Sequence, residues 1–182
     1  ILHGFPGLDY RGLVNLAINA SEYGTASAHG WPDGERFEPG REKTLVQHPH
    51  DDGVWIGSLA ALDLMPEVDA VVSMCRVGTK QHPTAEVVEF WVVDYPGENI
   101  TLDFTMTDAA NTVAQLRAEG KTVLLHCYAA HSRTPSTAAL YSALHLGVPI
   151  EKALKEVNAS LPSAMPQPFL VEAIKRIAKE KN

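Results

Sequence analysis

A cysteine and an arginine lie six positions apart (133 minus 127) in the segment HCYAAHSRT, residues 126–134. An apolar run precedes Cys127 and a helical pattern follows Arg133, so we expect a loop that leads from a strand into a helix. Such a loop directs successive backbone N–H groups at one point, where the helix N-terminus adds partial positive charge. The loop is therefore predicted to bind an anion and to stabilise Cys127 as a thiolate nucleophile.

Arg133 has the geometry that is needed to hold the bound anion. Its planar guanidinium group can donate two parallel hydrogen bonds to two phosphoryl oxygens. Ser132 and Thr134 flank it with hydroxyl groups that can bond to the thiolate or to a leaving group. We interpret the segment as a phosphate-binding loop (P-loop). The competing interpretation is that Cys127 is a small buried apolar residue and Arg133 an ordinary surface residue.

The strands and helices predicted around this loop indicate an α/β domain. Short β-rich runs alternate with helical patterns, which is typical of βα units around a mostly parallel sheet. The predicted strands are 53–58, 69–75, 86–93 and 121–127, and the predicted helices are 102–120, 133–147, 150–157 and 169–180. We expect a central, mostly parallel, four- to five-stranded sheet flanked by helices. The helix after Arg133 is apolar on nearly every side, so it is predicted to be central and buried.

The composition is that of an ordinary soluble protein. Of the 182 residues 45% are apolar and 20% are charged, and the formal net charge is −7. This charge disfavours nonspecific binding to nucleic acid or to an anionic membrane, because both require clustered lysine and arginine. With no bilayer-length apolar run and no secretion leader, we expect a cytoplasmic, monomeric protein. The loop is assigned to a domain over residues 51–182, with residues 1–50 as an extension packed against it.

The segment VLLHCYAAHSRT resembles the signature loop of the cysteine-dependent protein tyrosine phosphatase superfamily, and specifically that of the dual-specificity phosphatases, H-C-x-x-G-x-x-R-[ST]. GVWIGSLAALD is similar to the first strand and turn of those domains, and VDAVVSMC to their second core strand. The resemblance covers roughly residues 51–178. It implies a catalytic domain that hydrolyses phosphomonoesters through a phosphocysteine intermediate, with no metal and no other cofactor.

The resemblance also assigns roles within the loop. Cys127 is the nucleophile and Arg133 the phosphate clamp, the substrate-binding positions are Tyr128, Ala129, Ala130, His131 and Ser132, and the supporting positions are His126 and Thr134. His126 is expected to be a buried hydrogen-bonding support for the cysteine. His131 can touch either substrate or solvent. The family glycine falls on Ala130, which must therefore either adopt a left-handed backbone at some cost or bend the loop.

A phosphatase of this type also needs an acid that protonates the leaving oxygen. Members of the resembling family carry an aspartate some thirty residues before the cysteine, and Asp94 precedes Cys127 by 33 positions (127 minus 94). Asp94 follows an apolar strand and opens a turn that contains proline and glycine, which places it at the carboxyl edge of the sheet. Asp103 and Asp108 are the alternatives, but we expect a helix cap at Asp103 and a solvated helix face at Asp108.

Cys75 closes the predicted strand 69–75 and is a possible redox partner of Cys127. Parallel strands end at one edge of a sheet, so the two thiols are expected near each other. Some members of the resembling family carry a second cysteine at this strand end, and it rescues the oxidised nucleophile as a disulfide. The alternative is that Cys75 is a buried core thiol.

Two other interpretations place the chain in different functional classes. The segment HPHDD offers His48, His50, Asp51 and Asp52 as ligands for the divalent metal of a metal-dependent hydrolase, or it is simply a solvated linker. The other interpretation is a noncatalytic phosphate-binding module, in which Ala130 marks a decayed loop.

The substrate is only partly constrained by the sequence. YAAHS, between Cys127 and Arg133, contains no lysine or further arginine. The loop therefore offers too few cationic side chains to bind a polyanionic phosphoinositide head group well. A phosphorylated protein or a small phosphorylated metabolite is the expected partner. LVQHPHDDGVWIGSLAALD and LDFTMTDAANTVAQLRAEGKTV resemble bacterial, particularly actinobacterial, phosphatase-like domains that are fused to ADP-ribosylglycohydrolase domains. This resemblance adds a nucleotide-derived phosphate as a candidate.

Overall fold

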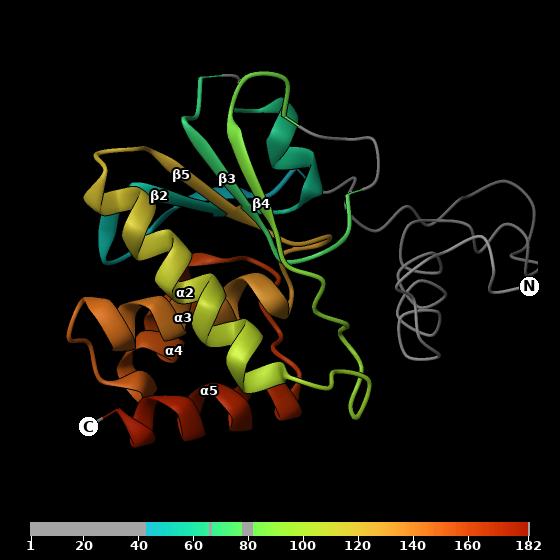
Figure 1. The fold of residues 1–182 in the computed structure, drawn as a ribbon, viewed down its shortest axis with the longest axis vertical. Helices are drawn as coiled ribbons and strands as arrows, with labels where there is room; N and C mark the ends of the chain where they lie inside the picture. The colour runs from blue at the N-terminus through green and yellow to red at the C-terminus, as the bar shows by residue number, and fades with distance from the viewer. Residues whose placement is uncertain (1–42, 66, 78–81, 182) are drawn as a thin grey trace, which may run out of the picture.

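The computed structural model describes residues 43–65, 67–77 and 82–181. Most of the predicted extension, residues 1–42, lies outside the described residues, and its packing stays a prediction. The described chain is built around one sheet with a layer of helices (Figure 1). In chain order the elements are β1 (Leu45–His48), β2 (Asp51–Gly57), the 3-10 helix η3 (Leu59–Asp63), β3 (Ala70–Ser73), β4 (Glu86–Glu89), α2 (Leu102–Ala118), β5 (Val123–His126), α3 (Arg133–His145), α4 (Ile150–Ser160) and α5 (Pro168–Glu180).

The five strands form one sheet in the order β1-β2-β5-β3-β4. β1 is antiparallel to β2, and the other neighbouring strands are parallel. β5 is the central strand, and the register places Gly57 of β2 and Ser73 of β3 on either side of His126. The carboxyl ends of three strands therefore meet where the loop that begins at Cys127 leaves the sheet. The predicted α/β fold with a mostly parallel sheet is confirmed.

The burial of each strand matches its place in the sheet. Every residue of β3 (AVVS) and β5 (VLLH) is buried, as expected for interior parallel strands that are covered on both faces. β4 (EVVE) lies at an edge, and its charged ends leave it partly exposed. The burial pattern thus agrees with the strand order, in which β3 and β5 are interior and β4 is at an edge.

The structure departs from the predicted elements mainly at strand ends. β4 stops at Glu89, whereas the predicted strand continued to residue 93. The backbone turns there, since Val92 N–H bonds to the Phe90 carbonyl and Val93 N–H to the Asn99 side chain. Two short elements, β1 and η3, were not predicted. β1 falls within the stretch assigned to the extension but pairs with β2, and the domain boundary after residue 50 stays a prediction.

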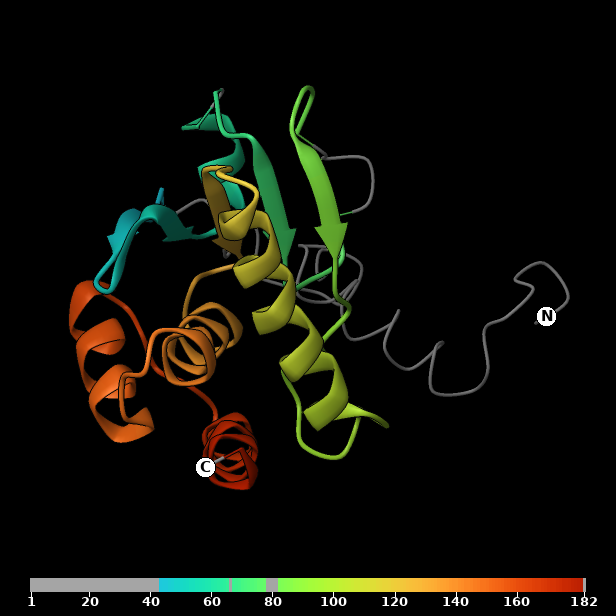
Figure 2. The same cartoon turned by 60° about the vertical axis from the view of Figure 1, so that its left-hand side comes forward.

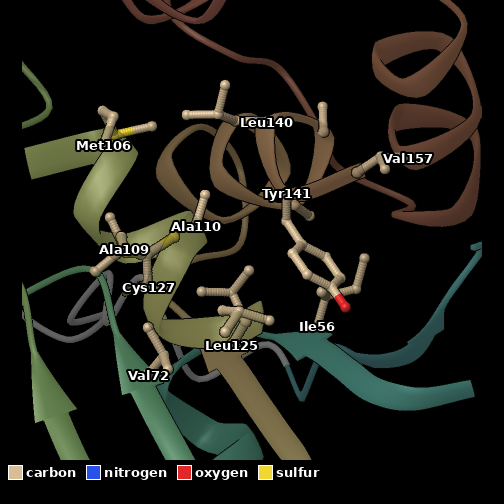
Figure 3. Packing of buried hydrophobic residues seen from close by; sticks show 14 of the residues in the cluster. Ile56, Val72, Met106, Ala109, Ala110, Leu125, Cys127, Leu140, Tyr141 and Val157 are labelled. Carbon is tan, nitrogen blue, oxygen red and sulfur yellow. The ribbon is translucent and has the colours of Figure 1, made fainter. Parts of the chain in front are cut away.

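The helices α2, α3, α4 and α5 lie together on one side of the sheet (Figures 1 and 2). α3 packs against the other three helices, and all its residues from Arg133 to Ser142 are buried, which confirms the predicted central helix. Figure 3 shows side chains of α2, α3 and the sheet meeting in one core, among them Leu125 and Tyr141. Leu125 has no exposed surface, so truncating it to alanine should cost about 2–5 kcal/mol of stability.

The opposite face of the sheet carries a smaller core under η3. Ala61 and Leu62 of η3 pack there with Val68, Val71 and Leu124. Among the described helices, none combines the length and the apolar character that crossing a bilayer requires.

Candidate active site

The loop of residues 127–132, here called the Cys127 loop, connects the end of β5 to the start of α3. It forms one wall of a pocket of about 150 Å³. The pocket is lined by Asp94, Cys127, Tyr128, Ala129, His131, Ser132 and Arg133. The structure thus brings the three predicted catalytic residues, Cys127, Arg133 and Asp94, to one small cavity at the carboxyl edge of the sheet.

Ala130 has a left-handed backbone, with φ of 58°. It is the one residue other than glycine with positive φ in the part of the chain that the structure describes. Of the two predicted outcomes, the left-handed conformation is therefore the observed one, and it costs roughly 1–2 kcal/mol relative to a right-handed residue. The Cys127 loop thus holds an alanine in a left-handed conformation at the position where the resembling family has glycine.

Arg133 is the first residue of α3 and is only 3% exposed. Its Nη1 donates a hydrogen bond to the Val92 carbonyl, with an N···O distance of 2.9 Å, which ties the guanidinium group to the segment before Asp94. The interpretation of Arg133 as a surface residue is wrong. Cys127 is 2% exposed, and it both packs in the core and lines the pocket.

Asp94 approaches the pocket from the segment between β4 and α2. Its Oδ1 accepts a hydrogen bond from the Ser132 hydroxyl at 2.8 Å. The two alternative acids, Asp103 and Asp108, do not line the pocket. Asp108 is exposed on α2, and Asp103 forms a two-pronged ion pair with Arg176 of α5. The cap predicted at Asp103 is wrong, since Thr101 is the N-cap of α2 and Asp103 lies inside the first turn.

His126 lies fully buried behind the loop. Its Nδ1 is 3.1 Å from the Cys127 carbonyl, which can only accept, so Nδ1 donates and Nε2 accepts the hydroxyl proton of Ser73 at 2.6 Å. Burial lowers the pKa of His126 to about 4, so the ring is neutral at pH 7. The neutral imidazole thus links the backbone carbonyl of Cys127 to the Ser73 side chain of the adjacent strand.

The two hydroxyl groups beside Arg133 bond to protein groups in this structure, and their bonds to the thiolate or to a leaving group stay a prediction. Ser132 donates to Asp94, as described above, and Thr134 donates to the Gly57 carbonyl of β2 at 3.3 Å. Thr134 therefore fastens the start of α3 to the sheet. His131 lines the pocket, and its buried Nε2 has no hydrogen-bond partner among the described residues, while its carbonyl accepts from Met165 N–H at 2.7 Å.

Sequence reasoning missed several supports of this site. Ser73 orients His126, Asn99 bonds to the backbone of Val93 next to Asp94, and the segment before α5 contacts the loop through Met165 and Gln167. The segment before α5, LPSAMPQP at residues 161–168, is proline-rich and lies between two predicted helices. Nothing in its spacing points to the Cys127 loop, because both contacts use its backbone N–H groups.

Cys75 lies just beyond β3, and Cys127 lies just beyond β5. The register pairs Ser73 with His126, and Met74 N–H bonds to the His126 carbonyl at 2.7 Å, so the two cysteines follow adjacent strand ends. Both cysteines are buried. The disulfide switch stays a prediction.

The histidines of the β1–β2 turn are held by protein groups. His50 Nε2 pairs with Glu156 Oε2 at 2.7 Å, and His48 Nε2 lies 3.2 Å from the Ala138 carbonyl. Asp51 accepts hydrogen bonds from Arg117 and Tyr141. We call His48, His50, Asp51, Arg117 and Tyr141 the β1–β2 network. The described residues contain no group of three or more histidine, cysteine, aspartate or glutamate side chains that could hold a metal ion.

The fold is shared with known phosphatases. Human DUSP28 is similar with a TM-score of 0.65 and 20% identity, over 75% of this chain and 93% of that one. A mouse putative dual specificity phosphatase complexed with zinc tungstate has a TM-score of 0.63 and 17% identity, over 83% and 94% of the two chains. The active form of Tk-PTP has a TM-score of 0.59 and 21% identity, over 72% and 95%. No protein-family model and no curated protein matches the sequence.

These similarities define the fold of the chain. The chain has the fold of the cysteine-dependent tyrosine phosphatases. More narrowly, it has the fold of the dual-specificity phosphatases. The predicted resemblance to this fold is confirmed.

Proposed function

We propose that this chain hydrolyses phosphomonoesters through a phosphocysteine intermediate. The observation that carries the proposal is the convergence of Cys127, Arg133 and Asp94 on one pocket of about 150 Å³. A nucleophile, a cationic clamp and a carboxyl group in one small cavity are the parts that this reaction requires. The shared fold is consistent with this assignment.

The proposed reaction has two steps. Cys127 Sγ attacks phosphorus, the bond from phosphorus to the ester oxygen breaks, and Asp94 gives its proton to the departing alkoxide. A water molecule then attacks the phosphocysteine, Asp94 takes up the proton of that water, and the thiolate leaves. In both steps Arg133 and the backbone N–H groups of the Cys127 loop stabilise the equatorial oxygens. The reaction needs no metal or other cofactor.

Substitution of Cys127 by serine tests the proposal directly. Cys127→Ser should abolish turnover of an aryl phosphate, since a serine hydroxyl in this loop lacks thiolate nucleophilicity. Vanadate or tungstate should still bind, because the N–H groups and Arg133 remain. Unchanged turnover in the variant would refute the proposal. Oxyanion binding by a wild type without turnover would instead support the noncatalytic phosphate-binding module.

The substrate class follows from the charge of the pocket. Arg133 is the one lysine or arginine among the lining residues, while Asp94 lines the same cavity. A single phosphate monoester on a protein or a small metabolite suits this lining better than a polyphosphorylated group. Turnover of phosphopeptides compared with phosphorylated sugars and nucleotides would identify the class.

A further inference from the structure

The backbone just before Asp94 is held by an asparagine five positions further along the chain (99 minus 94). Asn99 Oδ1 accepts a hydrogen bond from Val93 N–H at 2.8 Å, and Asn99 Nδ2 donates one to the Val93 carbonyl at 2.7 Å. Both polar groups of one backbone residue are thus bound by one side chain. Val93 is also fully buried, so the residue from which Asp94 extends has little freedom to move.

The carboxyl group of Asp94 is held separately, by Ser132. The Ser132 hydroxyl oxygen accepts a hydrogen bond from Gln167 N–H at 2.9 Å and donates its proton to Asp94 Oδ1 at 2.8 Å. Ser132 is only 3% exposed, so bulk water has little access to replace either partner. The backbone donor at Gln167 directs the hydroxyl, because an oxygen that already accepts from an N–H turns its single proton elsewhere.

A third contact joins the two supports. Arg133 Nη1 donates to the Val92 carbonyl at 2.9 Å. The segment of residues 92–94 is therefore held by Asn99 from its own loop, by Ser132 from the Cys127 loop and by Arg133 from the start of α3. If the loop that carries Asp94 closed over the pocket only when substrate binds, these bonds would be absent from the structure without substrate.

We propose that Asn99 and Ser132 preset the acid before substrate binds, with Asn99 fixing the backbone of Asp94 and Ser132 engaging Oδ1, so that the transferable proton resides on Oδ2. This inference rests on the proposed function. During cleavage, Oδ2 gives its proton to the ester oxygen as the bond to phosphorus breaks. During hydrolysis, Oδ2 takes a proton back from the attacking water. Asn99 is a positioning residue, since it acts only through Val93.

Leaving-group dependence tests this arrangement. Asn99→Ala and Ser132→Ala should each lower kcat by about 10- to 100-fold for phenyl phosphate, part of the 10²–10⁴-fold contribution of an acid. For p-nitrophenyl phosphate, whose leaving group needs little protonation, the loss should stay below about 3-fold. Ser132→Thr keeps the hydroxyl and should restore most of the phenyl phosphate rate. Asn111→Ala, the same substitution on α2, is the matched control and should leave both rates unchanged.

Two further measurements separate positioning from damage to the fold. Vanadate affinity should be the same in wild type, Asn99→Ala and Ser132→Ala, because the anion site is intact. Hydrogen exchange at residues 93–95 should accelerate in Asn99→Ala but not in Asn111→Ala. Equal losses for both substrates, or unchanged exchange at residues 93–95, would overturn this inference while leaving the proposed phosphatase intact. A wild type without Cys127-dependent turnover would overturn the proposed function itself, and the acid role with it.

Discussion

The Cys127 loop and the β1–β2 network are both rich in groups that can do chemistry, but the structure treats them in opposite ways. In the network, Arg117 and Tyr141 bind the carboxylate of Asp51, and His50 pairs with Glu156. At the Cys127 loop, the thiol, the guanidinium group and a carboxyl group face a cavity, and one residue has a strained backbone. Titratable groups that satisfy one another serve stability, whereas groups arranged around a cavity under strain indicate function.

The pKa of Asp51 supports a structural role for the β1–β2 network. Burial alone would raise the pKa of Asp51, but hydrogen bonds from Arg117 and Tyr141 outweigh it, and the pKa is lowered. Gly53 packs so closely that an added Cβ would come within 2.0 Å of the Arg117 guanidinium carbon. The network therefore has no room for a ligand at this point, unlike the Cys127 loop.

Exchanging each arginine for lysine should separate the two regions most clearly. Arg133→Lys should lower kcat/KM at least about 100-fold, because lysine cannot make the two-pronged contact with phosphoryl oxygens. Arg117→Lys should leave kcat/KM nearly unchanged and instead lower the melting temperature, because the contact that it weakens is structural. Steady-state kinetics with thermal unfolding of both variants checks the pair. The comparison fails if both variants lose activity in equal measure.

Substitution of Asp51 should show how strongly the network stabilises the fold. Asp51→Asn removes the charge that binds Arg117 and weakens the bond from Tyr141, and we expect a loss of about 2–4 kcal/mol in the free energy of unfolding. Urea denaturation measures this loss. Asp52→Asn, on the neighbouring residue, is the control and should change stability by less than about 0.5 kcal/mol. A large loss of kcat in the folded Asp51→Asn protein would mean that the network takes part in the reaction.

The β1–β2 network contains one buried histidine, His48, and another, His126, lies directly before the Cys127 loop. Both should make the stability of the fold sensitive to acid. Burial lowers the pKa of His48 and of His126 to about 4, from 6.5 in the unfolded chain. As the pH falls below 6.5, these two histidines take up protons in the unfolded state but stay neutral in the folded state. Their contribution to stability therefore falls as the pH drops from 6.5 towards 4, and it does not change with pH above that range. Each group contributes a slope of up to about 1.4 kcal/mol per pH unit.

Urea denaturation between pH 7 and pH 4.5 measures the combined slope. His48→Gln removes one titrating group and can keep a donor near the Ala138 carbonyl, so the slope should fall by up to about 1.4 kcal/mol per pH unit. An unchanged slope in this variant would show that His48 does not contribute to the acid sensitivity.

The smallest expected effect concerns the strained residue of the loop. Ala130→Gly should raise the free energy of unfolding by about 0.5–1 kcal/mol, because relief of the left-handed strain exceeds the entropic cost of glycine. Ala129→Gly, whose φ is not positive, should instead lower stability by about 0.5–1 kcal/mol. Thermal unfolding resolves the two signs. Loss of stability in both variants would mean that the alanine at 130 is accommodated without strain.

The parts of the site that were predictable from sequence are contiguous or have a fixed offset. Cys127 and Arg133 lie six positions apart (133 minus 127), at the junction of a strand and a helix that apolar patterning predicts. Asp94 was found only because the resemblance supplied its distance from the cysteine. The fold class followed from the alternation of strands and helices, whereas β1 was missed because four residues at a sheet edge carry little pattern.

The supports of the site could not be read from the sequence, because they depend on three-dimensional packing. Ser73 and His126 lie 53 positions apart and meet only through strand register. Gln167 reaches Ser132 through a backbone N–H, which every residue except proline offers. Asn99 is close to Asp94 in sequence, but asparagine in a turn is too common to single it out.

The strand order has a consequence for how the protein folds. β5 is the last strand in the chain but lies between β2 and β3, so Val54 and Val123 pair across 69 positions (123 minus 54). Until β5 has been synthesised, β2 and β3 each present an unpaired edge, and no native contact joins them within the sheet. Such long-range parallel pairing makes folding slow. The loop that carries the nucleophile therefore takes shape only in the step that closes the sheet, and a nascent chain that ends before β5 is prone to aggregate.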